Sequence, residues 1–181
     1  MRFGPIRRYS SSMGPIEGCG KTHISQELAR RTGIPYFKNS DEHKYFLSDP
    51  GYFVNAIRYV DTYFTSYLEA SGASVILDRA WPSEWVYSKV LGRSTDMEVL
   101  RELDRRHAAL GTWIVVAHRS DYSGVVDDYE AVNKNIRRIH DAYMDFAAWT
   151  QCKVVLLNVD DEDLDREVHD VLIATDERNN R

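Results

Sequence analysis

The sequence predicts a single α/β domain built on a parallel sheet, and three observations support this. The chain has 181 residues of ordinary globular composition, 43% hydrophobic and 28% charged, which fits one domain. Short runs rich in β-branched residues indicate buried strands at 75–77, 113–116 and 154–157. Longer segments with apolar residues three or four positions apart lie around these runs, as in helices that cover a sheet. Strands that alternate with helices predict βαβ units.

The predicted helices follow one another along the chain, and several have clear ends. The first, at 21–32, is ended by Gly33 and Pro35. The second carries apolar residues at helical spacing and ends before Gly72. Ser83 is a plausible cap for a helix that follows Pro82. The six predicted helices are 21–32, 52–70, 83–91, 96–110, 129–149 and 162–173.

Composition and charge exclude several classes of protein. No stretch of 18 apolar residues exists, so no membrane-spanning helix is expected. The two cysteines, Cys19 and Cys152, make neither a disulfide framework nor a zinc site. A reducing, cytoplasmic location is therefore expected. Residues 159–181 are acidic and the remainder is nearly neutral, whereas duplex DNA binders usually carry a net basic field. A nucleic-acid partner is possible but not favoured.

The strongest motif is a glycine-rich segment at 14–22, Gly-Pro-Ile-Glu-Gly-Cys-Gly-Lys-Thr, directly before the first helix. Its glycines allow backbone N–H groups to point at phosphate oxygens, and the helix N-terminus adds a positive partial charge. Lys21 would reach the β- and γ-phosphates of ATP, and the Thr22 hydroxyl would hold Mg²⁺. The expected nucleotide-binding residues are Gly14, Glu17, Gly18, Cys19, Gly20, Lys21 and Thr22. The segment departs from the usual pattern, which needs its first glycine at position 15, and the strand expected at 9–13 is polar.

A second motif, Asp78-Arg79, follows the strand at 75–77. A carboxylate at this strand end, beside a phosphate loop, is placed to join the Mg²⁺ shell. An arginine there suits bidentate contact with an anionic acceptor. Trp81 could wall a base-sized pocket, although aromatic residues in this helix are equally suited to simple packing.

These residues resemble the thymidylate kinase and deoxynucleoside kinase group of P-loop kinases. Ile-Glu-Gly-Cys-Gly-Lys-Thr at 16–22 resembles the thymidylate kinase loop Ile-Asp-Gly-x-Gly-Lys-Thr, and Leu77-Asp78-Arg79 resembles the Asp-Arg motif. With Ser83, Glu84 and Tyr87, the order is similar to small kinases of phages and actinobacteria. The resemblance implies a three-layer α/β/α P-loop NTPase fold with about five parallel strands, and ATP and Mg²⁺ as cofactors.

The chain is expected to form one kinase domain over 1–181, with 1–8 flexible and a frayed tail at 174–181. The resemblance implies a short lid, which is expected at 118–132. Members of the group often dimerise through helices like those at 52–70 and 83–91, so a homodimer is one expectation.

The resemblance assigns roles around the acceptor. Glu17 matches the loop acid that touches the acceptor sugar, and Arg79 matches the acceptor-phosphate arginine. Arg58 resembles a further acceptor arginine more loosely, and Phe53, Tyr59 or Phe64 could stack on a base. Cys19 stands where some members carry a catalytic arginine. The catalytic arginine is therefore expected among Arg119, Arg137 and Arg138.

The acceptor decides which further groups are needed. A monophosphate is already anionic and needs arginines rather than a general base, which favours a nucleoside monophosphate kinase of the thymidylate kinase type. The alternative is a kinase of a deoxynucleoside, a hydroxylated modified base or a nucleic-acid hydroxyl, with Asp41, Glu42 or Glu17 as general base. A further alternative is a non-catalytic nucleotide-binding switch, which the displaced glycine and polar first strand would suit.

Overall fold

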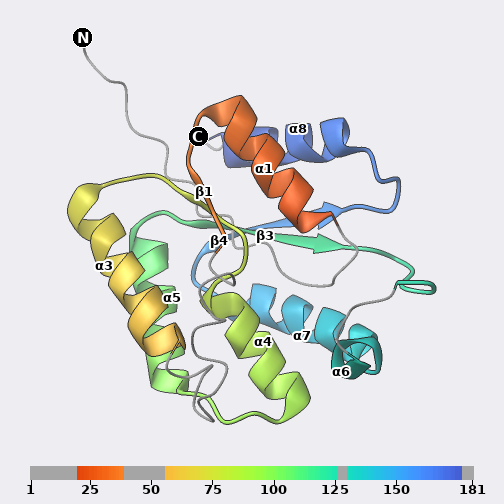
Figure 1. Cartoon of the computed structure of the whole chain (residues 1–181), viewed down its shortest axis with the longest axis horizontal. Helices are drawn as coiled ribbons and strands as arrows, with labels where there is room; N and C mark the ends of the chain where they lie inside the picture. Colours follow the sequence, from red (N-terminus) through yellow and green to blue (C-terminus); the bar gives the residue numbers. More distant parts are fainter. Residues whose placement is uncertain (1–19, 39–55, 126–129, 177–181) are drawn as a thin grey trace.

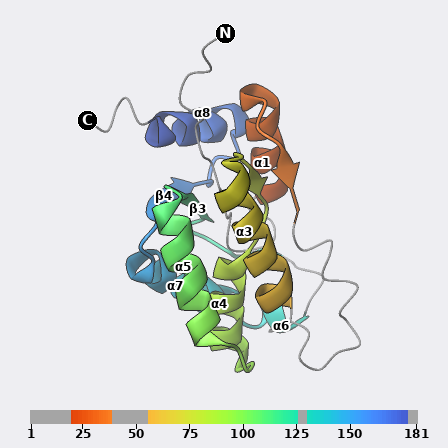
Figure 2. The ribbon, with the colours of Figure 1, turned by 90° about the vertical axis from the view of Figure 1, so that its left-hand side faces the viewer.

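The computed structural model describes residues 20–38, 56–125 and 130–176. Strands lie between two layers of helices (Figures 1 and 2). One face is covered by α1 (Lys21–Thr32) and α8 (Leu164–Thr175). The other face is covered by α3 (Thr62–Ser71), α4 (Trp81–Leu91), α5 (Met97–Ala109) and α7 (Ile136–Trp149). The predicted α/β/α layering is therefore confirmed.

The described strands form two parallel pairs. The short strand β1 (Tyr36–Phe37) pairs with β2 (Ile76–Leu77), in the register Tyr36 to Ile76. The longer β3 (Trp113–His118) pairs with β4 (Lys153–Asn158) over six residues. The three strands predicted from apolar runs are thus confirmed, with small shifts at their ends. The polar strand expected at 9–13 lies outside the described residues.

The helix expected at 52–70 takes a different form. A π-helical segment, η2 (Ala56–Asp61), leads into α3, and residues 52–55 lie outside the described part. At the junction the Thr65 hydroxyl donates to the Asp61 carbonyl at 2.7 Å, so this carbonyl has a side-chain partner. The helix ends as expected, at Gly72 in the left-handed region with φ 65°.

The helix expected at 129–149 is broken in two. A short α6 (Glu130–Asn133) precedes α7, which begins at Ile136. The Asn135 side chain donates to the Ala131 carbonyl at 2.8 Å, and its backbone is not helical (φ −123°, ψ 13°). A side-chain amide that competes for helix carbonyls in this way accounts for the interruption. The spacing of apolar residues, from which the helix was predicted, does not indicate this interruption.

Capping explains the bounds of two other helices. The Asp96 carboxylate accepts from the backbone N–H groups of Glu98 and Val99, so α5 begins at Met97. Asp163 accepts from the backbone N–H of Arg166 and starts α8. This last helix continues to Thr175, which is buried, two residues into the segment expected to fray.

The core lies on both faces of the strands: Ile24 of α1 and Val168 of α8 are fully buried on one side, and the larger helical layer packs on the other. Ile114, Val115 and Val116 of β3 are at most 1% exposed. An aromatic cluster joins α4 to α7, with Trp81 and Phe146 at 5.3 Å in an edge-to-face arrangement. Burying side chains of this size contributes about 1.5–3 kcal/mol each. This packing fixes the start of α4, which follows Asp78 and Arg79 in the chain.

His107 is a buried polar group within this core, 2% exposed. Its Nε2 lies 3.1 Å from Thr65 Oγ1 and its Nδ1 lies 3.1 Å from Thr112 Oγ1. The ring therefore ties α3 to the residue before β3. Burial, with a smaller contribution from Arg106, lowers the pKa of His107 to about 4. Among the described residues, no helix combines the length and the apolar character needed to cross a membrane.

Candidate active site

The N-terminus of α1 forms one side of the candidate site. Gly20 adopts φ 65°, a left-handed conformation that favours glycine, and Lys21 is the first helical residue. The first N–H groups of a helix have no partner within the helix, which makes this end suited to anions. Lys21 itself is 6% exposed. The rest of the expected phosphate loop, namely Gly14, Glu17, Gly18 and Cys19, lies outside the described residues.

Thr22 and Asp78 meet although 56 positions separate them. Thr22 Oγ1 donates to Asp78 Oδ2 at 2.7 Å, and Asp78 is 1% exposed. Asp78 directly follows β2, and its backbone N–H donates to the Phe37 carbonyl of β1 at 2.9 Å. The strand pair therefore fixes the backbone of Asp78, and α1 supplies the hydroxyl. The two residues predicted as metal ligands are brought together here.

The chemistry of these groups fits a magnesium–nucleotide complex. The Thr22 hydroxyl donates its hydrogen bond to Asp78, so the lone pairs of the Thr22 oxygen are available to a cation. Hydroxyl and carboxylate oxygens are the hard ligands that Mg²⁺ prefers, usually one or two from the protein with the rest from phosphates and water. Within the described ranges no group of three or more His, Cys, Asp or Glu side chains could hold a metal alone. Thr22 and Asp78 supply two oxygen ligands, so they suit a metal whose remaining ligands come from phosphates and water.

Arg79 follows Asp78 in an unusual backbone conformation, with φ 67°. A non-glycine residue held in this region costs about 1–3 kcal/mol, so the surrounding packing must maintain it. Its guanidinium carbon lies 6.0 Å from the centre of the Tyr87 ring. The Tyr143 hydroxyl donates to Ser83 Oγ at 3.1 Å, and burial raises the pKa of Tyr143. Arg79 thus lies beside a cluster of hydroxyl groups formed by Ser83, Tyr87 and Tyr143. The sequence alone predicts no role for Tyr143.

The other predicted arginines are distributed differently. Arg119, after β3, pairs with Glu162 Oε1 at 2.8 Å, and its backbone N–H donates to the Tyr122 hydroxyl. Arg137 is exposed in the first turn of α7. Arg138 is also exposed and donates to Asn135. None of these is described in contact with Asp78, so the choice among them stays a prediction.

Arg58 lies at the surface in an ion pair, so its expected contact with the acceptor stays a prediction, whereas Trp81 does not occupy the position expected of an acceptor-binding group. Arg58 Nη2 contacts Asp96 Oδ2 at 2.5 Å, at the start of α5. Trp81 is 2% exposed and packs against Phe146, Trp149 and His107. The expectation that Trp81 walls a pocket is therefore corrected: its ring is a core group. Asp41 and Phe53 lie outside the described residues.

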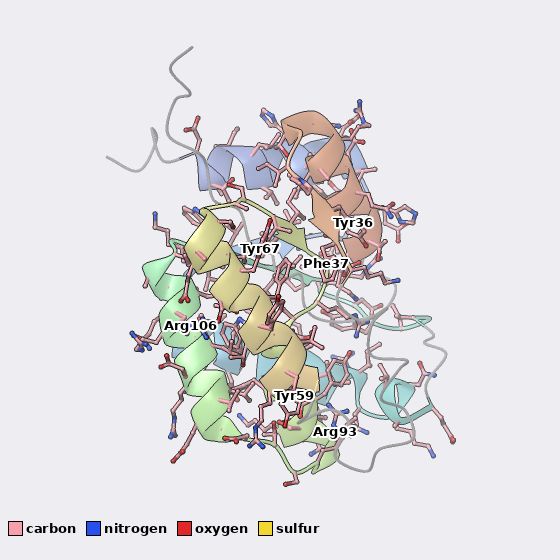
Figure 3. The ribbon with its side chains drawn as sticks, turned by 60° about the vertical axis from the view of Figure 1, so that its left-hand side comes forward. Tyr36, Phe37, Tyr59, Tyr67, Arg93 and Arg106 are labelled. Atoms are coloured by element: carbon pink, nitrogen blue, oxygen red, sulfur yellow. The ribbon has the colours of Figure 1, made fainter. Side chains whose placement is uncertain are left out.

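The sequence predicts no functional role for the two aromatic residues of β1, Tyr36 and Phe37. The Tyr36 hydroxyl donates to Asp78 Oδ2 at 3.0 Å. Phe37 stacks on Phe64 with ring centres 5.1 Å apart, and Phe64 lies 6.3 Å from Tyr67 (Figure 3 labels Tyr36, Phe37 and Tyr67). A two-residue strand has no periodicity to detect. The sequence offers one signal for these residues: they directly precede the polar segment with Asp41 and Glu42, the general-base candidates of a nucleoside kinase.

Comparisons with known proteins identify the fold of this chain but no sequence family. No protein-family model and no curated protein matches the sequence. The structure is similar to the YorR protein of Bacillus subtilis in complex with phosphorylated GDP, with a TM-score of 0.67 and 17% identity over 96% of this chain and 98% of that one. It is also similar to a thymidylate kinase from Ehrlichia chaffeensis, with a TM-score of 0.59 and 17% identity over 93% and 98% of the two chains. A gluconokinase from Sinorhizobium meliloti gives a TM-score of 0.58 and 12% identity over 99% and 96%. Together with the layered α/β architecture, these likenesses show that the chain has the fold of the P-loop kinases.

Proposed function

We propose that the protein transfers the γ-phosphoryl group of Mg·ATP to a deoxynucleotide-like acceptor, as a nucleoside monophosphate kinase of the thymidylate kinase type. The observation that carries this proposal is the hydrogen bond from Thr22 to Asp78 beside Lys21 at the N-terminus of α1. In a kinase fold, this combination serves phosphate and its metal rather than fold stability alone.

Each residue of the site has a defined task under this proposal. Thr22 and Asp78 would hold Mg²⁺, which neutralises charge on the phosphates. Lys21 and the N–H groups of α1 bind phosphate oxygens and hold them still. Phosphoryl transfer depends mainly on positioning and charge neutralisation, so fixed cations are what the chain has to supply.

Arg79 is the proposed contact for the acceptor phosphate. It is adjacent to Asp78, and its guanidinium borders the Tyr87 ring. Arg119 and Arg137 are the proposed sources of positive charge for the transferred group. The YorR complex with phosphorylated GDP and the thymidylate kinase support a nucleotide acceptor by their likeness in fold. A deoxyadenosine kinase from M. mycoides with bound dCTP, at a TM-score of 0.53, keeps the nucleoside acceptor in the test.

The test is ADP release from Mg·ATP across a panel of acceptors: deoxynucleoside monophosphates, deoxynucleosides, and oligonucleotides with plain or hydroxymethylated bases. Turnover with a monophosphate would support the proposal. Turnover only with a nucleoside, or only with a hydroxylated base, would replace the acceptor. ATP binding without turnover on any acceptor would favour a nucleotide-binding switch.

The assay needs a lysine pair as its control. Lys21→Ala should lower turnover by about 10²–10³-fold, the usual effect of removing one electrostatic contact to the developing charge. Lys89→Ala removes an exposed lysine of α4 that pairs with Asp145 at 2.7 Å, and it should leave turnover unchanged. Equal losses in both variants would show that the measured activity does not arise at this site.

A further inference from the structure

We infer that Tyr36 is a positioning residue of the metal site, whose hydroxyl orients the Asp78 carboxylate for Mg²⁺. This inference rests on the proposed function and adds a residue to which the kinase motifs assign no role. Its basis is the hydrogen bond from the Tyr36 hydroxyl to Asp78 Oδ2 at 3.0 Å.

The strand register explains why Tyr36 can reach Asp78. Tyr36 is paired with Ile76 in the parallel β1–β2 ladder. Alternate residues of a strand share a face, so Asp78 lies on the same side as Ile76 and therefore as Tyr36. The tyrosine side chain is long enough to span the remaining two-residue offset. Thr22 approaches the same oxygen from α1.

The two hydrogen bonds fix the carboxylate. A carboxylate oxygen has two lone pairs, and Asp78 Oδ2 accepts one hydrogen bond from Thr22 and one from Tyr36. Rotation of the carboxylate would break both. Both hydrogen bonds use Oδ2, so Oδ1 would be available to hold Mg²⁺ or a water bound to it. Without Tyr36, the Thr22 hydroxyl would be the only side chain among the described residues that donates a hydrogen bond to the Asp78 carboxylate, and this hydroxyl must also serve the metal.

The backbone does not need this hydrogen bond. The main chain of Asp78 is already held by the Phe37 carbonyl at 2.9 Å, and β1 is paired with β2 through its own ladder. The Tyr36 hydroxyl thus adds orientation of one side chain. Hydrogen-bond partners of metal ligands typically change metal affinity or activity by 10–100-fold when they are removed.

The experiment is a titration of the full chain with MnCl2 in the presence of ADP, in which electron paramagnetic resonance measures free Mn²⁺. Tyr36→Phe should weaken Mn²⁺ binding by about 10–100-fold. Affinity for ADP in EDTA should stay within twofold of the wild type, because the phosphate contacts of α1 remain. Turnover should recover at high Mg²⁺, so the Mg²⁺ requirement rises while kcat changes little. A structural defect would not produce this separation.

Two control variants make the outcomes decisive. Tyr63→Phe removes the hydroxyl of a tyrosine that is 79% exposed on α3, and it should leave Mn²⁺ affinity unchanged. Asp78→Asn should abolish the Mn²⁺ site. Unchanged Mn²⁺ affinity in Tyr36→Phe, with Asp78→Asn defective, would overturn the role of Tyr36 but leave the proposed function intact. Equal loss of ADP affinity in EDTA would also overturn it, since the damage would then be general. A wild-type chain without any Mn²⁺·ADP site sensitive to Asp78 would instead refute the proposed function.

Discussion

Two regions that follow the strands differ in how they hold their charged groups. After β2, Asp78 is 1% exposed and accepts hydrogen bonds from Thr22 and Tyr36. After β3, Arg119 pairs with Glu162, whose side chain is 70% exposed. The first region is fixed before any ligand arrives. In the second, the Arg119 side chain is itself only 15% exposed, and its ion pair reaches a carboxylate at the surface, where such pairs contribute about 0–1 kcal/mol.

This difference matches the two tasks that the proposed phosphoryl transfer would require. A metal ligand must be placed before binding, since reorganisation during the reaction costs rate. A cation that meets the transferring group can be released from a weak partner when the nucleotide binds. The contrast therefore predicts a large loss of turnover when Asp78 after β2 is substituted, and a small one when Glu162, the exposed partner of Arg119, is substituted.

The largest expected effect comes from Asp78→Asn, which removes the charge that the proposed Mg²⁺ site requires. Turnover should fall by about 10²–10³-fold, measured as acceptor-dependent ADP release. Asp145→Asn is the matched control, because Asp145 is an exposed carboxylate of α7 that pairs with Lys89. Retention of full turnover by Asp78→Asn would remove the basis of the comparison.

A second test concerns the core that supports the site, and it measures how the stability of the protein depends on pH through His107. The pKa of His107 is about 4 in the folded chain and near 6.5 when unfolded, so the unfolded state binds a proton first as pH falls. Stability should be full above pH 6.5 and decline towards pH 4, by at most about 3 kcal/mol. Urea unfolding at pH 7 and pH 4.5 measures this decline. His107→Gln should show a smaller decline between the two pH values, and an equal decline would assign it to other groups.

Arg79 provides a test in which two variants differ in stability but not in activity. Arg79→Gly relieves the left-handed backbone at φ 67° but removes the guanidinium. Arg79→Ala removes the guanidinium and keeps the unfavourable backbone. The glycine variant should be more stable than the alanine variant by about 1 kcal/mol in denaturant unfolding. Both variants should lose turnover equally, and a better activity in one would show that the backbone conformation itself matters.

The smallest effect is expected on the other side of the comparison. Glu162→Gln removes the partner of Arg119 at the surface and should change the free energy of unfolding by less than about 1 kcal/mol. Turnover should stay within threefold of the wild type, whereas Arg119→Ala should reduce it by at least tenfold if this arginine meets the transferring group. A large loss in Glu162→Gln would mean that the ion pair is part of the working site.

The sequence predicted those features that depend on local patterns. Lys21–Thr32 was predicted with both ends correct, because Gly33 ends it in the left-handed region. The meeting of Thr22 and Asp78 followed from the order of motifs. The break at Asn135 is local, but it depends on a side-chain hydrogen bond to Ala131 that the apolar spacing does not indicate. The burial of Trp81 and the backbone of Arg79 depend on neighbours far away in the chain. Tyr36 was missed for the same reason, since only the β1–β2 register brings it to Asp78.

The hydrogen bonds around His107 also define a direction. Thr65 Oγ1 uses its single proton on the Asp61 carbonyl, so it can only accept from the imidazole. The neutral ring is therefore the Nε2–H tautomer, and Nδ1 accepts from the Thr112 hydroxyl. Donors and acceptors then run one way, from Thr112 through His107 and Thr65 to the end of the π-helical turn. Reversing the imidazole or a threonine hydroxyl would leave a donor facing a donor or an acceptor facing an acceptor, so the four groups form a hydrogen-bonded chain of fixed direction across the helical layer.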